Sequence, residues 1–136
     1  IAGCGGFVNI TQNAKRVYYC GTFTAGGLKC STKDGKLIID QEGKSDKFID
    51  TVEQITFSGK YANKVGQPVM YITERAVFEL REDGVYLTEV APGIDIQTHT
   101  FFSQQLYQLR ISPSSLMSRH IKPNHTIHEM LFQRIH

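Results

Sequence analysis

Short apolar runs separated by turn residues are the main pattern of this chain. Residues 15–23 are apolar and rich in aromatics, which predicts a buried strand. Residues 69–80 are β-branched and aromatic enough for one long strand, or for two strands broken near Glu74-Arg75. Asp34-Gly35 and Asp83-Gly84 each lie between apolar runs and predict two β-hairpins. Long helices do not alternate with these strands, so the pattern predicts an antiparallel or mixed sheet with few helices.

Weaker patterns assign the segments between and beyond these strands. Glycine, alanine and cysteine dominate the first residues, which predicts a loop over residues 1–10 that enters an extended segment. The other expected elements are a turn at residues 24–27, a short helix or a loop at 46–52, a short strand at 54–57, one or two helical turns at 60–66 and a helix at 95–109. Beyond residue 112 we expect loose structure, because apolar residues are scattered among Ser, Pro, His and Arg.

Length and composition fit one globular domain. The chain has 136 residues, of which 40% are hydrophobic and 21% are charged, and this argues against disorder of the whole. No apolar run reaches the length of a membrane span. The net charge of +2 is too small to indicate a nucleic-acid partner. We therefore expect neither a membrane nor a nucleic acid as a partner.

The character of the chain changes near Gln97. Residues 1–97 hold 11 of the 15 Lys and Arg and 12 of the 13 acidic residues, whereas residues 98–136 hold four basic residues and one acidic residue. All five His and none of the 12 Gly lie in this second part. We therefore divide the chain into residues 1–97 and a divergent, basic, His-rich tail at 98–136, for which we expect partial disorder.

Three cysteines, Cys4, Cys20 and Cys30, are an odd number without a C-x-x-C spacing. They make a poor framework for disulfides or zinc and favour reduced thiols, as in the cytoplasm. Apolar neighbours predict that Cys20 lies in the core, and the flanking glycines of Cys4 predict exposure.

The glycine-rich segment Gly3-Cys4-Gly5-Gly6-Phe7-Val8-Asn9 is the most suggestive candidate for a binding site. Adjacent glycines let a ligand approach the backbone, and their N–H groups could hold a phosphate or an oxyanion. The spacing is not the G-x-G-x-x-G of dinucleotide-binding folds. From the glycines alone, a simple tight turn is the more ordinary interpretation.

For the other residues that could take part in catalysis or metal binding, the sequence favours structural roles. Glu74 and Arg75 are neighbours on an expected strand, which points them to opposite faces and favours pairing of each with an adjacent strand. Nothing in the sequence brings Glu89 and Asp95 together. Three tail histidines have a metal-like spacing but no acids or cysteines cluster with them, so a solvated tail is favoured and no metal site is expected. These histidines are His120, His125 and His128.

Residues 1–97 resemble the C-terminal part of the short-chain acyl-CoA transferases of family I, the acetate or propionate CoA-transferase group. The glycine-rich segment followed by Ala14-Lys15 is similar to the glycine loop of that family. Further similar blocks follow in one order: Cys20-Gly21-Thr22-Phe23-Thr24-Ala25-Gly26-Gly27-Leu28-Lys29, Gln41-Glu42-Gly43-Lys44, Lys47-Phe48-Ile49, Glu53-Gln54-Ile55-Thr56-Phe57-Ser58-Gly59, Tyr71-Ile72-Thr73-Glu74-Arg75-Ala76-Val77-Phe78 and Leu87-Thr88-Glu89-Val90-Ala91-Pro92-Gly93-Ile94-Asp95.

The resemblance implies an open α/β fold with a mixed sheet, of which this chain forms the C-terminal part. Enzymes of this family move CoA between an acyl-CoA and a free short-chain carboxylic acid, through a thioester formed on a glutamate. That glutamate lies in a Glu-x-Gly motif upstream of the glycine loop. The resemblance therefore places the nucleophile outside this chain, and we expect no catalytic residue and no activity in the chain alone.

The resemblance also implies binding residues and partners. Gly5 and Gly6 would offer backbone N–H groups to the thioester oxygen, with Gly3 and Asn9 in the same acyl-CoA-binding segment. Asn9 stands where relatives often carry Asp. The expected partners are an acyl-CoA and a short-chain carboxylate, with no cofactor besides the CoA thioester as substrate, in a cytoplasmic homo-oligomer.

Two other interpretations stay open. One is a non-catalytic β-rich structural or interaction module derived from the same fold, and the other is a metal-binding module that rests on the tail histidines. The tail departs from the family, whose members continue into a helix and a short acidic stretch. We interpret residues 98–136 as a frameshifted or otherwise altered C-terminus.

Overall fold

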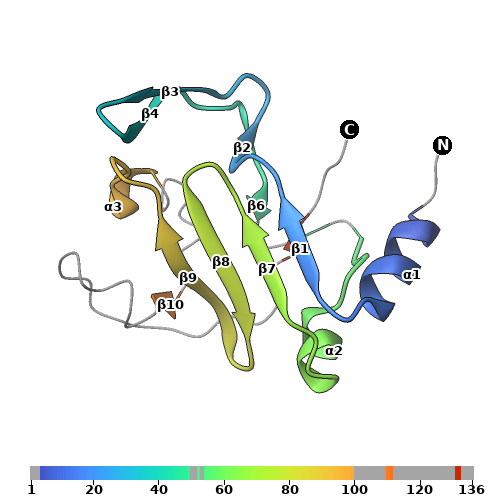
Figure 1. Ribbon diagram of the computed structural model, residues 1–136. Helices are drawn as coiled ribbons and strands as arrows, with labels where there is room; N and C mark the ends of the chain where they lie inside the picture. Colours follow the sequence, from blue (N-terminus) through green and yellow to red (C-terminus); the bar gives the residue numbers. More distant parts are fainter. Residues whose placement is uncertain (1–3, 50–51, 53, 100–109, 112–130, 133–136) are drawn as a thin grey trace.

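A five-stranded sheet with the strand order β1-β7-β8-β9-β10 is the centre of the structure (Figure 1). This computed structural model describes residues 4–49, 52, 54–99, 110–111 and 131–132. The elements are α1 (Gly5–Asn13), β1 (Val17–Cys20), β2 (Thr24–Ala25), β3 (Lys29–Lys33), β4 (Lys36–Gln41), β5 (Ser45–Asp46), β6 (Phe48–Ile49), α2 (Gly59–Lys64), β7 (Val69–Ile72), β8 (Ala76–Arg81), β9 (Gly84–Val90), α3 (Ile96–His99), β10 (Arg110–Ile111) and β11 (Leu131–Phe132). Among these described residues, no helix is long and apolar enough to cross a membrane.

The central sheet is mixed, as predicted. β1 pairs in parallel with β7, and β9 pairs in parallel with β10. The neighbours β7, β8 and β9 pair antiparallel. Residues 69–80 form two strands broken at residues 73–75, and the turn from β8 to β9 is formed by Glu82 and Asp83, with Gly84 as the first residue of β9. The expected hairpin is therefore confirmed, with its turn one residue earlier than predicted, and so is the break near Glu74-Arg75.

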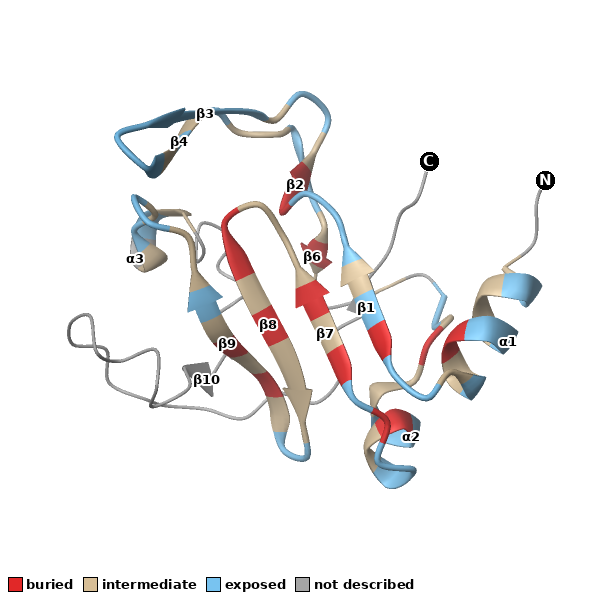
Figure 2. Ribbon diagram, viewed as in Figure 1, coloured by how far each residue is buried: buried red, intermediate tan, exposed pale blue. Residues whose placement is uncertain are grey.

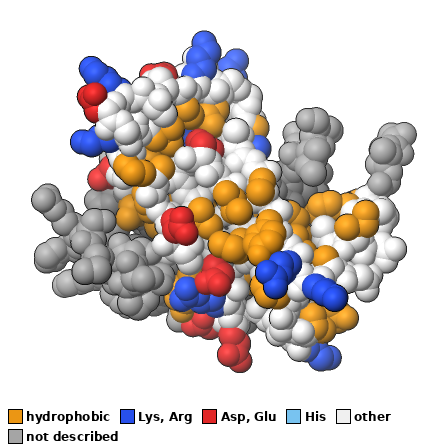
Figure 3. Space-filling model, in the orientation of Figure 1, with side chains coloured by type: hydrophobic (Ala, Val, Ile, Leu, Met, Phe, Trp, Pro, Cys, Tyr) orange, Lys and Arg blue, Asp and Glu red, His pale blue; other side chains and the backbone are white. Residues whose placement is uncertain are grey.

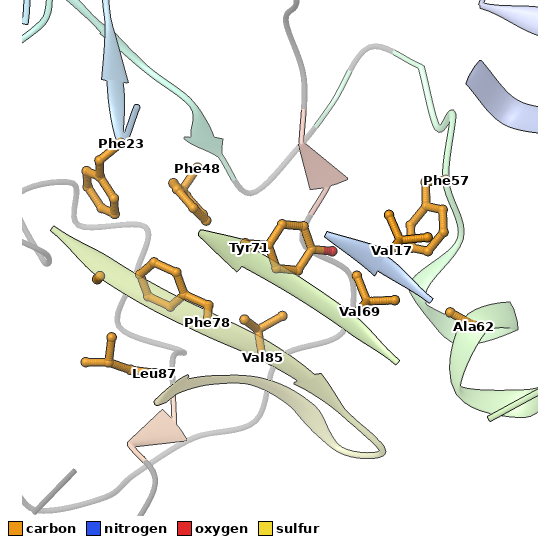
Figure 4. Packing of buried hydrophobic residues seen from close by; sticks show 11 residues of the cluster. Val17, Phe23, Phe48, Phe57, Ala62, Val69, Tyr71, Phe78, Val85 and Leu87 are labelled. Carbon is orange, nitrogen blue, oxygen red and sulfur yellow. The ribbon is translucent and has the colours of Figure 1, made fainter. Parts of the chain in front are cut away.

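The core covers one face of this sheet. Alternate residues of the strands point into it, and aromatic side chains of the β1–α2 connection close it from the other side (Figure 4). Phe48 contacts Phe23 and Phe78, with ring centroids 4.9 and 5.1 Å apart. Burial of each such ring stabilises the fold by roughly 2–3 kcal/mol. The buried apolar residues are Val17, Phe23, Phe48, Phe57, Ala62, Val69, Tyr71, Ala76, Phe78, Val85 and Leu87.

Strands β3 and β4 form a hairpin that stands away from the central sheet and is largely exposed (Figure 2). Asp34 and Gly35 have φ angles of 53° and 72°, the positive values that a tight two-residue turn requires. The N–H of Leu37 donates to the carbonyl of Pro92 at 2.7 Å and ties the hairpin to the segment after β9. The sequence prediction for Asp34-Gly35 is confirmed.

Residues 5–13 form a helix, so the loop predicted over residues 1–10 is wrong for the described part. Its two glycines and its β-branched residues have low helix propensity, but tertiary contacts outweigh that preference. The buried Thr11 hydroxyl donates to the carbonyl of Phe7 at 2.7 Å. The Gln67 side chain donates from Nε2 to the carbonyls of Thr11 and Ala14 at 2.8 and 2.6 Å. A prediction from neighbouring residues does not include Gln67, which binds the end of this helix from more than fifty residues away in the sequence.

Three further expectations meet a different structure. Cys20 is exposed, because it ends β1 on the sheet face opposite the core. Residues 54–57 form no strand; they connect β6 to α2 and contribute Phe57 to the core. Residues 45–49 form the short strands β5 and β6, which pair with β2 and β11, where a short helix or a loop was expected from residue 46. The helical turns predicted at 60–66 are confirmed by α2, and the Ser58 hydroxyl caps it by accepting from the N–H of Tyr61.

Candidate functional site

The N-terminal turn of α1 brings Gly5 and Gly6 to an open position. Both glycines are exposed, and a Cβ built on either would meet nothing within 4 Å. The N-cap position holds Cys4, whose side chain makes no capping hydrogen bond, and the first turn contains no acidic residue. The first N–H groups of a helix lack intrahelical partners and carry partial positive charge. This end of α1 can therefore receive a negatively charged or strongly polarised oxygen.

The orientation of α1 follows from contacts at both of its ends. Near the glycines, the ring of Phe7 lies 6.1 Å from the ring of Tyr19 on β1, measured between centroids. At the other end, Gln67 holds the last carbonyls, and the Oε1 of Gln12 accepts from the N–H of Ser58 at 2.6 Å. Burial raises the pKa of Tyr19 to about 12, which agrees with its position between the helix and the core. The glycine N–H groups thus sit on a helix clamped to the sheet.

This N-terminal turn lies at the edge of the sheet where β1 and β7 end. A short connection at residues 14–16 reverses the chain between α1 and β1, so α1 lies to the side of β1 and its start is level with the carboxyl end of that strand (Figure 1). β7 is parallel to β1 and ends at the same edge. In open α/β sheets, ligands bind beyond the carboxyl ends of the strands. Position and local chemistry therefore favour the same site.

A buried ion cluster occupies the turn between β7 and β8. The side chain of Arg75 is fully buried, and its guanidinium donates to both carboxylate oxygens of Glu42, at 2.5 and 3.0 Å. Its Nε donates to Glu74 at 2.7 Å, and its Nη1 donates to the carbonyl of His99 at 2.9 Å. The guanidinium also lies over the ring of Phe23, 4.7 Å from its centroid. One arginine in the β7–β8 turn thereby joins the residue that follows β4, the end of α3 and the β1–β2 connection.

The two carboxylates of this cluster serve as acceptors. The hydrogen bond from Arg75 holds the pKa of Glu42 below its usual range, and the Thr24 hydroxyl donates to Glu42 at 3.0 Å. Glu74 accepts from the N–H of Phe23 at 2.8 Å. Carboxylates engaged in this way are weakened as nucleophiles, so the cluster is built to hold the fold rather than to attack a substrate. The prediction that Glu74 and Arg75 pair with different neighbours is wrong for this contact, because the turn lets Arg75 bond Glu74 directly.

The structure does not bring all four predicted binding residues to one place. The helix brings Gly5 and Gly6 together at its start, whereas Asn9 lies one turn further on and is exposed. The carbonyl of Asn9 and its Oδ1 both accept from Asn13 Nδ2, at 2.8 and 2.9 Å. Gly3 and the three spaced tail histidines lie outside the described residues. Within residues 4–99, apart from the undescribed positions, no group of three His, Cys, Asp or Glu side chains could hold a metal ion.

Comparison with known proteins gives a close match over part of the chain. Acetate CoA-transferase YdiF of Escherichia coli K12 is 56% identical over 97 residues, which are 71% of this chain and 18% of YdiF. Caffeate CoA-transferase of Acetobacterium woodii is 50% identical over 99 residues, with the same shares. No protein-family model matches the chain.

Solved structures agree. The apoenzyme of the acyl-CoA transferase YdiF from Escherichia coli O157:H7 superposes with a TM-score of 0.78 and 50% identity, over 84% of this chain and 22% of that one. The same transferase in a thioester complex with CoA superposes equally well. These similarities support a family I CoA-transferase region that covers part of the chain. The fold is the mixed sheet of that CoA-transferase, and the chain spans about a fifth of the length of its curated relatives.

Sequence reasoning singled out the glycines as a candidate site, which stays a prediction, and it did not predict the Arg75 cluster. Paired glycines are a local signal, whereas Glu42 and Arg75 are 33 residues apart in the sequence and meet only in the folded chain. The block that contains Glu42 was part of the family resemblance, but no local pattern identifies its partner.

Proposed function

We propose that this chain is the C-terminal part of a short-chain acyl-CoA:carboxylate CoA-transferase. The proposed reaction moves CoA from an acyl-CoA to a free short-chain acid through a glutamyl-CoA thioester. The observation that carries the proposal is the 56% identity to acetate CoA-transferase YdiF of Escherichia coli K12. The structure of YdiF from Escherichia coli O157:H7 is known as a thioester complex with CoA. Three free thiols suit the reducing cytoplasm, where we place the enzyme as a homo-oligomer.

In this proposal the chain binds the acyl-CoA and does not supply the nucleophile. Gly5 and Gly6 present N–H groups at an open helix end, where the thioester oxygen becomes negative when the nucleophile adds. Glu42 and Glu74 are held by Arg75, which leaves them poor candidates for the nucleophile. The nucleophilic glutamate is therefore assigned to a part of the enzyme outside these 136 residues.

A chimera tests the proposal directly. The segment of Escherichia coli YdiF that matches this chain is replaced by residues 1–97, and exchange between acetyl-CoA and isotope-labelled acetate is measured. We expect exchange within about tenfold of YdiF, a CoA thioester on a glutamate of the YdiF portion by peptide mass mapping, and no exchange by the 136-residue chain alone. A folded but inactive chimera would instead favour the non-catalytic module. A thioester on Glu42 or Glu74 would contradict the assignment of the nucleophile.

A further inference from the structure

A pocket of about 580 Å³ lies at the edge of the central sheet where β7 begins. Residues of α2, of the connection from α2 to β7, of the end of β8 and of the turn after it line this pocket. Its volume is within the range of about 300–1,000 Å³ that is typical of small-molecule sites. β1 and β7 run in parallel away from this edge, so the pocket and the first turn of α1 lie toward opposite ends of these strands (Figure 1). The pocket is therefore separate from the candidate site at Gly5 and Gly6.

The walls of this pocket are joined by hydrogen bonds within the chain. After α2, Gly66 has a φ of 68°, and its N–H donates to the carbonyl of Asn63 at 3.1 Å. The N–H of Gln67 donates to the carbonyl of Ala62 at 2.8 Å, which completes the reversal from α2 into β7. The Nδ2 of Asn63 donates to the carbonyl of Arg81 at 2.8 Å and ties α2 to the end of β8. These bonds form without a ligand, so the pocket is preformed.

Two lysines at the pocket form no ion pair with a described residue. Lys60 and Lys64 are four residues apart on α2, which places them on one face of that helix. The third cation at the pocket, Arg81, already pairs with Glu79 at 2.8 Å. Basic and acidic side chains both gather in the lower part of the view in Figure 3, over α2 and the turn between β8 and β9. Two unpaired ammonium groups favour a ligand group with two negative charges, such as a phosphate monoester near pH 7.

Other residues of the pocket supply acceptors. Gln67 is only 7% exposed, and its Nε2 donates to two carbonyls of the segment that ends α1, whereas its Oε1 has no hydrogen-bond partner among the described residues. Buried acceptors in native proteins ordinarily have a donor, so this oxygen indicates a donor that the described chain does not supply. The exposed carboxylate of Glu82 is a second acceptor, and it forms no ion pair with a described residue. A ligand with hydroxyl groups beside its phosphate complements both acceptors.

We propose that this pocket binds a small phosphate monoester that carries hydroxyl groups, of the size of a pentose phosphate. The phosphate lies against Lys60 and Lys64, since lysine binds phosphate as a point charge. The hydroxyl groups donate to Gln67 and Glu82, and the half-buried Leu80 gives the ligand an apolar contact. The proposal does not depend on the transferase reaction, because no residue of the pocket belongs to the glycine-rich segment or to the Arg75 cluster.

Titration calorimetry of the full 136-residue chain tests the ligand chemistry. The probe is ribose 5-phosphate, and the matched probes are ribose, which lacks the phosphate, and inorganic phosphate, which lacks the hydroxyl groups of the sugar. We expect one molecule of ribose 5-phosphate per chain, bound about tenfold more tightly than either matched probe, because each lacks one set of contacts. Absence of saturable binding, or equal affinity for ribose 5-phosphate and inorganic phosphate, would overturn the proposal.

A pair of double variants locates the bound probe. Lys60→Gln with Lys64→Gln should weaken the binding of ribose 5-phosphate about tenfold, since both lysines that face the phosphate are lost. The matched control, Lys33→Gln with Lys36→Gln, removes two exposed lysines from the β3–β4 hairpin and should leave the affinity within about twofold. Circular dichroism verifies that both double variants fold. Equal weakening by the two would show attraction to net charge alone and would overturn the proposal, as would amide shifts on ribose 5-phosphate binding that fall at α1 and not at residues 60–68 and 80–82.

Discussion

Replacement of Arg75 by Met should destabilise this chain more than any exposed arginine can. Met keeps much of the apolar volume of the arginine side chain but removes its five donors. The change leaves Glu42 and Glu74 without their shared cation, and it frees the carbonyl of His99. It also removes the contact between the guanidinium and the ring of Phe23.

The structure sets the size of the expected effect. Loss of one partner from a buried ion pair costs about 3–5 kcal/mol, because the remaining charge is left buried. The side chains of Glu42 and Glu74 are 37% and 18% exposed, so water can reach them once Arg75 is gone. The loss should therefore lie at the lower end, about 3 kcal/mol, which corresponds to a decrease of about 10 °C in melting temperature for a chain of this size.

Urea unfolding of the 136-residue chain measures this loss. The matched control is Arg81→Met, because Arg81 pairs with Glu79 while both side chains are about two-fifths exposed, at 38% and 41%. Exposed pairs contribute at most about 1 kcal/mol, so the control should unfold close to the wild type. Equal losses for the two variants, or a loss below about 1 kcal/mol for Arg75→Met, would refute the clamp that Arg75 forms.

Four further predictions concern single positions. Glu42→Gln should lower the free energy of unfolding near pH 7, and the difference from wild type should shrink as the pH falls below about 4.5. The reason is that a carboxylate with a lowered pKa stabilises the fold only while it is ionised. Urea titrations at several pH values measure this difference. Gly43→Ala should lower the melting temperature, since its Cβ would overlap the backbone of Ala25. Gln67→Leu should cost about 1–3 kcal/mol and speed amide exchange at the end of α1, because two carbonyls lose their donor. Gly6→Val should change the unfolding free energy by less than about 0.5 kcal/mol and reduce the kcat of the chimera about 10²-fold.

The strands were predictable because their signals are local. Asp34-Gly35 forms the turn of its hairpin, whereas Asp83-Gly84 indicates a hairpin whose turn lies one residue earlier, at Glu82 and Asp83. The apolar run at residues 69–80 predicts both of its strands and the break between them. Each of these features depends on residues a few positions apart. Cys20 shows the limit: an apolar run indicates a strand, but which strand face meets the core depends on the register with β7.

The helix α1 and the ion cluster were not predictable for a related reason. The segment that forms α1 has poor intrinsic propensity and becomes helical through Gln67 and Gln12, whose contacts join distant parts of the chain. Arg75 likewise meets Glu42 across 33 positions. The family resemblance supplied the glycines as a site, but it did not supply their conformation.

The helical conformation of Gly5 and Gly6 changes the explanation of why glycines occupy these two positions. A requirement for positive φ cannot apply, because Gly5 and Gly6 are helical and neither is among the residues with positive φ. A crowded backbone cannot apply either, since a Cβ at each would meet nothing within 4 Å. Glycine in a helix costs about 1 kcal/mol relative to alanine, so the fold of this chain gains nothing from two of them. Under the proposed function, an acyl-CoA at the helix end accounts for both the open space and the N–H groups that the first helical turn leaves without intrahelical partners. If Gly6→Val left the kcat of the folded chimera unchanged, that account would fail and the space would belong to another part of the enzyme.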